Sequence, residues 1–338
     1  MTLSARTFAW LLVPLTLMSA LIALTAGPSG LSVAGVWQAL WQPDAGVNGL
    51  IVWQLRLPRL LLALCVGALL GLCGALIQGL FRNPLAEPGL MGVSSGATLA
   101  VVATLIFAPG LLALLPNPLE TLARPAIAFI GGLIATTLVM LLGRDNTHSP
   151  LRLILAGVAF NMVAAAGLGL CSYLASNEQL RTLTFWTLGS FGAATWQAVG
   201  VTAAILVGIA LLAWPLHKPL NALLLGESEC RHLGFQVPRL KRRVIFLCAA
   251  GVGAAVAFTG IIGFIGLVVP HMVRLLVGPD HRRVLPLSLG FGALLTLWAD
   301  WLARTVISPA ELPVGIVTAL LGGPFFIYLI HRQRSTGL

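Results

Sequence analysis

Residues 60–77 of the chain read LLLALCVGALLGLCGALI, a run without any charged side chain. A helix needs about 20 mostly apolar residues to cross the hydrocarbon core of a bilayer, so this run, extended to 58–80, predicts a membrane-spanning helix. Similar apolar runs, separated by charged or Pro/Gly-rich breaks, continue in both directions along the chain. Together they predict ten spans, at residues 7–27, 58–80, 91–108, 122–143, 151–174, 196–214, 243–262, 264–278, 284–304 and 312–331.

The composition agrees with a chain that lies almost entirely in a membrane. Hydrophobic residues make up 58% of the 338 positions and charged residues 9%, against roughly 45–50% and about 25% in soluble domains. We therefore expect an all-α polytopic protein whose residues 1–338 form a single transmembrane domain in contact with membrane lipid. The basic residues lie in short clusters between apolar runs, which is typical of topology signals and not of nucleic-acid binding.

The distribution of Lys and Arg predicts the orientation. Cytoplasmic loops of membrane proteins carry the excess of positive charge, so both termini are expected to be cytoplasmic. The first span follows Arg6 as a signal peptide would, but no Ala-x-Ala site comes after it, and we expect an uncleaved helix. With this orientation, five of the 20 Lys and Arg residues fall outside: Arg56, Arg59, Arg124, Arg181 and Arg304.

The ten spans divide into two five-helix halves. Because five is odd, two repeated halves would cross the membrane in opposite orientations, as an inverted pseudo-symmetric pair. The tripeptide PRL at 58–60 precedes Gly71 at the same spacing at which PRL at 238–240 precedes Gly251. One such match in a chain rich in Leu and Gly fits an inverted repeat and a chance similarity equally well.

Small residues within the spans are interpreted as packing residues. Glycines such as Gly67 and Gly71 let helices approach closely, and the five cysteines form no CxxC pair. Residues 92–96, GVSSG, match the nucleophile motif G-x-S-x-G, but that motif needs a strand before it, and here it opens an apolar helix. We therefore expect no metal site and no hydrolase activity.

The charged residues also bear on the energy source. An ion-coupled carrier binds its ion through ionisable groups inside the membrane, whereas here Asp300 is the only acidic residue within an apolar run, and Arg304 one turn later can pair with it. The chain has no G-x-x-x-x-G-K-[ST] motif to hold ATP phosphates. Ion-coupled transport is thus disfavoured, and we expect a chain that is no enzyme, binds no cofactor and draws its energy from partner subunits.

Residues 215–243 form the longest predicted cytoplasmic segment. Within it, residues 220–234 predict a short helix, a glycine hinge and a second short helix closed by glycine. Such a pair suits docking to a separate motor subunit, and an interfacial amphipathic helix without a partner is the alternative. The candidate coupling residues are Leu220, Asn221, Leu224, Gly226, Glu227, Glu229, Arg231, Leu233 and Gly234.

Several long motifs resemble the FecCD family of ABC-transporter permeases for iron-siderophores, haem and vitamin B12. They occur in the family's order and cover nearly the whole chain: RLPR at 56–59, QGLFRNPLAEPGLMGVSSGA at 78–97, GFIGLVVPHMVR at 263–274, DWLAR at 300–304 and ELPVG at 311–315. The resemblance implies ten helices per subunit and a homodimer with its pathway on the dimer axis. It also implies two cytoplasmic ATPases that bind ATP and Mg, a periplasmic substrate-binding protein, and the bacterial inner membrane.

The resemblance assigns expected roles to particular residues. Residues 220–234 match the family's coupling helices, and residues 179–190, QLRTLTFWTLGS, are most similar to the haem branch, with siderophores and vitamin B12 as alternatives. Arg56, Arg59 and Arg304 match arginines that dock the binding protein, and simple snorkelling to the interface is the other interpretation.

The fifth span is expected to line the pathway. Helical spacing places five candidates on one of its faces, although the opposite face is similarly apolar. All six histidines fall on the predicted inner side, so no iron-ligating histidine is expected along the outer pathway. The pathway candidates are Phe160, Asn161, Ala165, Leu168 and Ser172.

Overall fold

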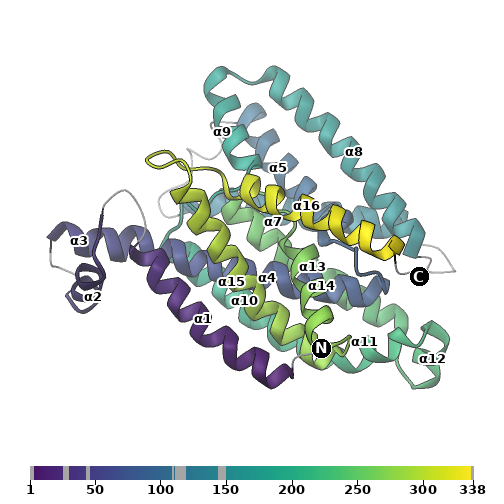
Figure 1. Cartoon of the computed structure of the whole chain (residues 1–338). Coiled ribbons are helices and arrows are strands. Elements are labelled where there is room, and N and C mark those ends of the chain that lie inside the picture. The colour runs from purple at the N-terminus through teal and green to yellow at the C-terminus, as the bar shows by residue number, and fades with distance from the viewer. Residues whose placement is uncertain are drawn as a thin grey trace.

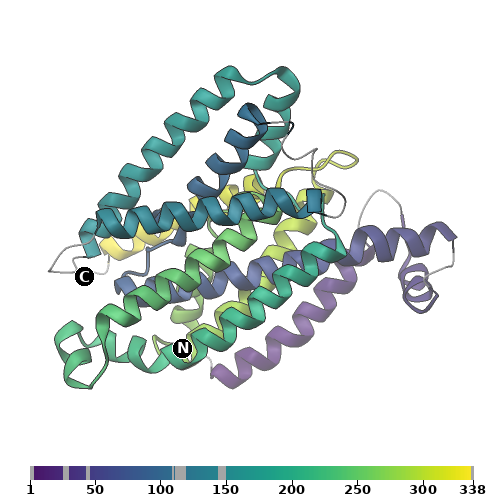
Figure 2. The ribbon, with the colours of Figure 1, turned by 180° about the vertical axis from the view of Figure 1, so that it is seen from behind.

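The computed structural model describes residues 4–25, 30–42, 46–108, 110, 119–143 and 150–335, and every regular element in these ranges is a helix (Figures 1 and 2). Ten of them correspond to the predicted spans, which confirms the all-α polytopic fold. Residues 26–27 of the first predicted span and His148 lie outside the described residues. The ten helices are α1 (Ala5–Thr25), α4 (Leu57–Phe81), α5 (Val93–Phe107), α7 (Leu119–Leu142), α8 (Pro150–Leu174), α10 (Trp196–Ala213), α13 (Val237–Thr259), α14 (Ile265–Val277), α15 (His281–Thr305) and α16 (Val314–Ser335).

Length separates these helices into two groups. In the described part of the chain, seven are long and apolar enough to cross a membrane, while α5, α14 and the apolar part of α16 are shorter. The α13 helix begins at Val237, six residues before the predicted span at 243, because Pro238 suits the first turn of a helix and the basic residues after it are good helix formers.

The α4 helix is the centre of the bundle. It packs against α15, α14, α13 and α10, and it runs through the middle of the molecule in both views (Figures 1 and 2). Its sequence is apolar on all sides, as expected of a helix that other helices surround completely. The stretch that predicted a membrane span is therefore also the stretch around which the other helices assemble.

Glycines set how closely the neighbours approach α4. A Cβ atom added at Gly67 or Gly71 would collide with a main-chain oxygen of α15, and one added at Gly74 would collide with a main-chain oxygen of α14. Helices in a membrane gain their packing energy from such close contact, because no water is expelled when they associate. The glycines are thus packing residues, as their positions in the span indicated.

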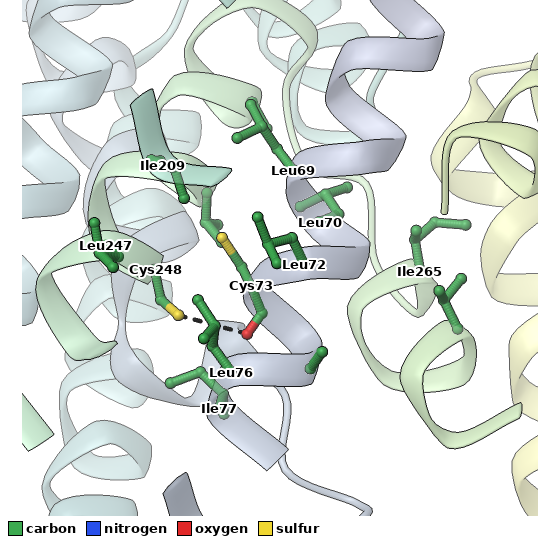
Figure 3. Close-up of a cluster of buried hydrophobic side chains, with 14 of the residues drawn as sticks. Leu69, Leu70, Leu72, Cys73, Leu76, Ile77, Ile209, Leu247, Cys248 and Ile265 are labelled. Carbon is green, nitrogen blue, oxygen red and sulfur yellow. Dashed lines mark hydrogen bonds between the residues drawn. The ribbon is translucent and has the colours of Figure 1, made fainter. Parts of the chain in front are cut away.

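Cysteines fill the same core. Figure 3 shows Cys73 of α4 and Cys248 of α13 among leucine and isoleucine side chains, with the Cys248 thiol donating to the Cys73 carbonyl oxygen at 3.4 Å. All five cysteines are free thiols, and four of them are buried. They act here as small apolar side chains.

Two of the short helices begin inside the bundle. The α5 helix follows the turn η2 (Pro88–Met91) at Gly92, and α14 follows a turn that begins at Gly260. A Cβ added at Gly266 would lie 3.2 Å from Pro88 Cδ and 3.3 Å from the carbonyl oxygen of Leu70, halfway along α4. The turn before α5 and the turn before α14 therefore meet in the interior of the bundle. The two turns precede the third helix of each five-helix half, so they lie at corresponding places in the two halves.

Short helices at the two ends of the bundle complete the fold. Residues 30–42 and 46–56, which the hydropathy pattern left unassigned, contain α2 (Val33–Trp41), α3 (Gly46–Leu50) and the π-helical turn η1 (Ile51–Arg56). They lie at one end of the bundle, here called the α2 end, and α12 (Glu227–His232) lies at the opposite α12 end (Figures 1 and 2). Sequence analysis missed α2 and α3 because they are too short to give a span signal.

Candidate functional site

The predicted coupling segment forms two short helices at the α12 end. After the turn η3 (Trp214–Leu216), α11 (His217–Leu224) is joined to α12 at Gly226, which has a φ of 125°. Gly234, with a φ of 85°, follows α12. Residues other than glycine rarely adopt these φ values, so the two glycines allow the chain to turn sharply at both ends of α12.

One face of this segment is fixed to the bundle. Leu220, Leu223 and Cys230 are fully buried, and the carboxylate of Glu227 accepts a hydrogen bond of 2.6 Å from Lys241 at the start of α13. Arg231 lies 3.6 Å from the same carboxylate. The segment therefore moves with the bundle and is not a loose loop.

The other face of the segment is exposed and partly apolar. Leu224, Leu225 and Leu233 are 41%, 69% and 58% exposed, and Glu229 is exposed as well. Exposed apolar side chains that gather on one surface are typical of protein contact sites. This face is therefore suited to protein binding.

A chain of buried polar contacts runs from α11 into the bundle. Asn221 Oδ1 accepts a hydrogen bond from the His281 backbone N–H at 2.8 Å and lies 2.9 Å from His281 Nδ1. His281 Nε2 is 3.5 Å from Arg274 Nη2, and Arg274 Nη1 donates to Gln78 Oε1. The Gln78 amide in turn donates to the Leu267 carbonyl oxygen at 2.9 Å. One continuous polar path thus connects α11 with α15, α14 and the end of α4.

Sequence reasoning named only Asn221 from this path. The sequence signal for the other residues of the path is a polar or charged side chain inside an apolar run. Gln78 in the span 58–80 and Arg274 in the span 264–278 are two such residues. Such side chains cost free energy in a membrane unless they find partners. Their partners lie up to 199 positions away in sequence, so only the folded chain identifies them.

The arginines predicted to dock a binding protein take part in a buried ion network at the α2 end. Asp300 is fully buried, and its carboxylate accepts hydrogen bonds of 2.9–3.2 Å from Arg59 Nε and Nη2. Arg304 Nε lies 3.2 Å from the same carboxylate, as the spacing in the sequence predicted. Arg59 Nη1 also binds Glu311 at 2.8 Å. Two arginines therefore share one buried carboxylate, and Glu311 covers the network from the solvent side.

Arg56 and Arg304 hold the end of the first helix. Arg56 donates to the Leu24 carbonyl oxygen, and Arg304 donates to the Ala23 carbonyl oxygen at 3.2 Å. These carbonyls belong to the last turn of α1, whose oxygens have no partner within the helix and attract positive charge. All three arginines are thus bound within the chain, and the snorkelling interpretation does not describe them. Their docking role stays a prediction.

The fifth span, α8, places three of its five predicted pathway residues toward the chain itself. Phe160 packs on the main core and Leu168 on a small cluster with Val102 of α5, while Asn161 donates to the Gly89 carbonyl oxygen at 3.3 Å. Ser172 bonds to the preceding turn of its own helix, and Ala165 is exposed. A different and more exposed face consists of Leu155, Met162, Val163, Leu170 and Tyr173. The α8 sequence is apolar all round, so periodicity did not distinguish the two faces.

A cavity of about 770 Å³ lies toward the α2 end, between α7, α10, α13 and α9 (Asn177–Thr187). A capping box of Ser176 and Gln179 begins α9, and Gln179 also donates to the Leu105 carbonyl oxygen of α5 at 3.0 Å. Arg124, Arg181 and Trp186 are among the residues that line the cavity. Its volume is within the range of small-molecule sites, roughly 300–1,000 Å³, and its two guanidinium groups suit an anionic ligand.

Backbone contacts fix the wall of this cavity that follows α9. The Ser190 N–H donates to the Thr259 carbonyl oxygen at 2.8 Å, and the Val314 N–H donates to the Gly189 carbonyl oxygen at 2.9 Å. The ends of α9 and α13 and the start of α16 therefore meet at one junction. The stretch 179–190, singled out in the sequence, forms α9 and this junction.

Comparison with known proteins decides the family. The model of the FecCD transport family matches residues 15–332. The chain belongs to the FecCD transport family. It is 42% identical to the hemin transport system permease protein HmuU of Yersinia pestis over 94% of this chain and 95% of that protein. It is 39% identical to the vitamin B12 import system permease protein BtuC of Klebsiella pneumoniae over 98% of this chain and 96% of that protein.

The solved structure of an ABC transporter has the same fold. An inward-facing metal-chelate type ABC transporter superimposes with a TM-score of 0.84 at 33% identity, covering 97% of this chain and 99% of the other. The chain is therefore the permease of an ABC importer and a multi-pass membrane protein of a family that sits in the bacterial inner membrane. The resemblance found in the sequence motifs is confirmed.

The described residues give no support to the enzyme alternative. Residues 92–96 begin α5 directly after η2, and no strand precedes them in the described part of the chain, although the nucleophile motif requires one. The relatives are permeases, so the role of this FecCD chain is conduction.

Proposed function

We propose that this chain conducts haem as one half of a homodimeric ABC importer, with a periplasmic binding protein outside and two ATPases inside. The 770 Å³ cavity is the observation that carries the choice of haem. Haem carries propionate carboxylates on a flat apolar ring, and the cavity offers Arg124, Arg181 and the indole of Trp186. The side chains of vitamin B12 are mainly neutral amides, which gain less from two arginines.

The cavity also explains why one short stretch carries the resemblance to the haem branch. Arg181, Trp186 and Ser190 belong to residues 179–190 and line the cavity. Vitamin B12 permeases share 38–40% identity with this chain, close to the 42% of the hemin permease, so overall identity does not separate the two ligands. The proposal therefore rests on the local chemistry of this wall.

The coupling segment supports the assignment of the energy source. We assign the exposed leucines of α11 and α12 to the contact with the ATPase, which binds ATP and Mg. Closure of the ATPase pair would then move Asn221, and the polar path through His281 and Arg274 would carry that movement to α4 and α14. Asp300, the carboxylate expected of an ion-coupled carrier, is bound by Arg59 and Arg304 and is not free to bind a transported ion.

The exposed face of α8 supports a second copy of the chain as partner. Met162, Val163 and Tyr173 are 70%, 69% and 86% exposed, and they form part of a face that no described element of the chain covers. In the homodimer this face would lie on the dimer axis, so it replaces the face with Phe160 and Asn161 as the proposed lining. The resulting lining is apolar and would bind haem weakly, which lets the ligand leave.

Uptake into liposomes tests the proposed ligand. The assembly with its ATPase and binding protein should import haem when ATP is supplied, and should import little haem whose propionates are esterified. The double variant Arg124→Gln/Arg181→Gln should lose most haem uptake, whereas Arg239→Gln/Arg243→Gln, which removes the same charge from α13, should retain it. Uptake of vitamin B12 or a ferric siderophore in place of haem would overturn the choice of ligand, and haem uptake without ATP would overturn the coupling.

A further inference from the structure

A second cleft lies at the α12 end, next to η3, the turn that precedes α11. It has a volume of about 620 Å³ and lies between the start of α1, η3 and the start of α15. Arg6, Arg282 and Arg283 line it together with Trp214 and Asp280. The N-terminal arginine and the two of α15 are more than 270 positions apart, so the tertiary structure alone gathers this charge.

The cleft keeps a positive charge despite its carboxylate. Asp280 Oδ1 accepts hydrogen bonds from Asn221 Nδ2 at 2.7 Å and from the Arg282 backbone N–H at 3.0 Å, and Asp280 Oδ2 lies 3.9 Å from Arg283 Nε. Burial acts to raise the pKa of Asp280, but these hydrogen bonds and Arg283 outweigh it and hold the pKa below its ordinary value. Three guanidinium groups against one ionised carboxylate leave a net charge of +2 at neutral pH.

The surroundings of the cleft are those of a membrane boundary. The cleft is at the ends of membrane-spanning helices, and the indole of Trp214 in its wall is 48% exposed. Arg6, Trp10, Val13 and Leu17 follow one another at helical spacing along α1, and the last three are 78%, 60% and 67% exposed. A single face of α1 thus leads from a basic group, past a tryptophan, to apolar side chains that lipid tails can contact.

We propose that this cleft binds the phosphodiester headgroup of an anionic phospholipid, whose acyl chains lie along the exposed face of α1. Arg6 and Arg282 would contact the phosphate oxygens, and Trp214 would lie at the level of the glycerol backbone. Basic pockets between transmembrane helices recognise anionic headgroups in this manner. The site does not depend on haem being the transported ligand.

Lipid retention by the purified full-length chain tests the proposal. The delipidated protein is supplied with phosphatidylglycerol or phosphatidylcholine in detergent, and bound lipid is counted by native mass spectrometry. We expect phosphatidylglycerol to be retained in preference. Arg6→Gln/Arg282→Gln should weaken its retention by about tenfold or more, while Arg239→Gln/Arg243→Gln, with the same loss of charge outside the cleft, should bind as the wild type does.

Further measurements distinguish a lipid headgroup from a soluble phosphate ester, and a lipid partner from a protein partner. Soluble glycerol phosphate, added in excess, should compete weakly, because it lacks the acyl chains. Equal retention of both lipids, competition by glycerol phosphate at the affinity of the lipid, or equal loss in the control variant would each overturn the proposal. If the cleft variant retains phosphatidylglycerol but loses the ATPase partner, the cleft is a protein interface. If the double variant does not fold, the single variant Arg6→Gln is measured, with the same expected direction.

Discussion

Replacing Asp300 with asparagine removes the charge on which two arginines converge inside the bundle. The carboxylate is fully buried, and the side chains of Arg59 and Arg304 are only 12% and 8% exposed. Removing one partner of a buried ion pair costs roughly 3–5 kcal/mol, because the remaining charge stays buried without compensation. Glu311 still binds Arg59, but that carboxylate is 41% exposed, and exposed pairs contribute only about 0–1 kcal/mol. We therefore expect Asp300→Asn to destabilise the protein by roughly 3–4 kcal/mol.

The cysteines provide the assay. Four of the five free thiols are buried, so a thiol-reactive fluorophore labels the protein in detergent as it unfolds on heating. At roughly 2 °C per kcal/mol for a large domain, the melting temperature of Asp300→Asn should fall by about 6–8 °C. Glu311→Gln is the matched control, and its melting temperature should fall by no more than about 2 °C. If Asp300→Asn melts together with this control, the network is not a stabilising element and the reasoning is refuted.

Three further predictions concern coupling, docking and packing. Asn221→Ala should leave ATP hydrolysis by the assembled transporter active but uncouple it from uptake; equal loss of both activities would contradict the polar path. If Arg59 contacts the periplasmic protein, Glu311→Gln should tighten binding of that protein, because it removes a carboxylate that competes for Arg59. An unchanged affinity would exclude Arg59 from that interface. Gly74→Ala should lower the melting temperature, since its Cβ meets the α14 backbone, whereas Gly208→Ala, with open space around its Cβ, should leave it equal or higher.

The spans were predictable because hydropathy is a local property. Each membrane helix must be apolar over about 20 residues wherever it lies in the fold, so the run at 60–77 identified α4 without any knowledge of its neighbours. The helix pair around Gly226 was also predictable, since glycine at a helix end is a local signal. The family followed from motifs whose order along the chain is itself a sequence property.

The faces of the helices were not predictable in the same way. A helix that is apolar all round gives no periodic signal, and for this reason the pathway face chosen on α8, with Phe160 and Leu168, is turned toward the chain's own α5 and core. The arginines predicted to dock a binding protein show the same limit. Their positions matched the family, but nothing in the sequence indicates that Arg59 is bound to a carboxylate 241 positions away.

The sequence by itself thus determined that the chain is a membrane protein, where its ten membrane helices begin and end to within about six residues, and which of its segments forms two short helices joined at Gly226. Those properties follow from composition and spacing over one or two dozen residues, whereas the permease role came from the resemblance of the motifs to the FecCD family. The tertiary structure alone decided which polar groups meet: Asp300 with Arg59, Gln78 with Arg274, and Arg6 with Arg282 across a shared cleft. A polar side chain inside a membrane needs a partner, because leaving it unpaired there costs free energy. That cost does not specify which residue along the chain the partner is.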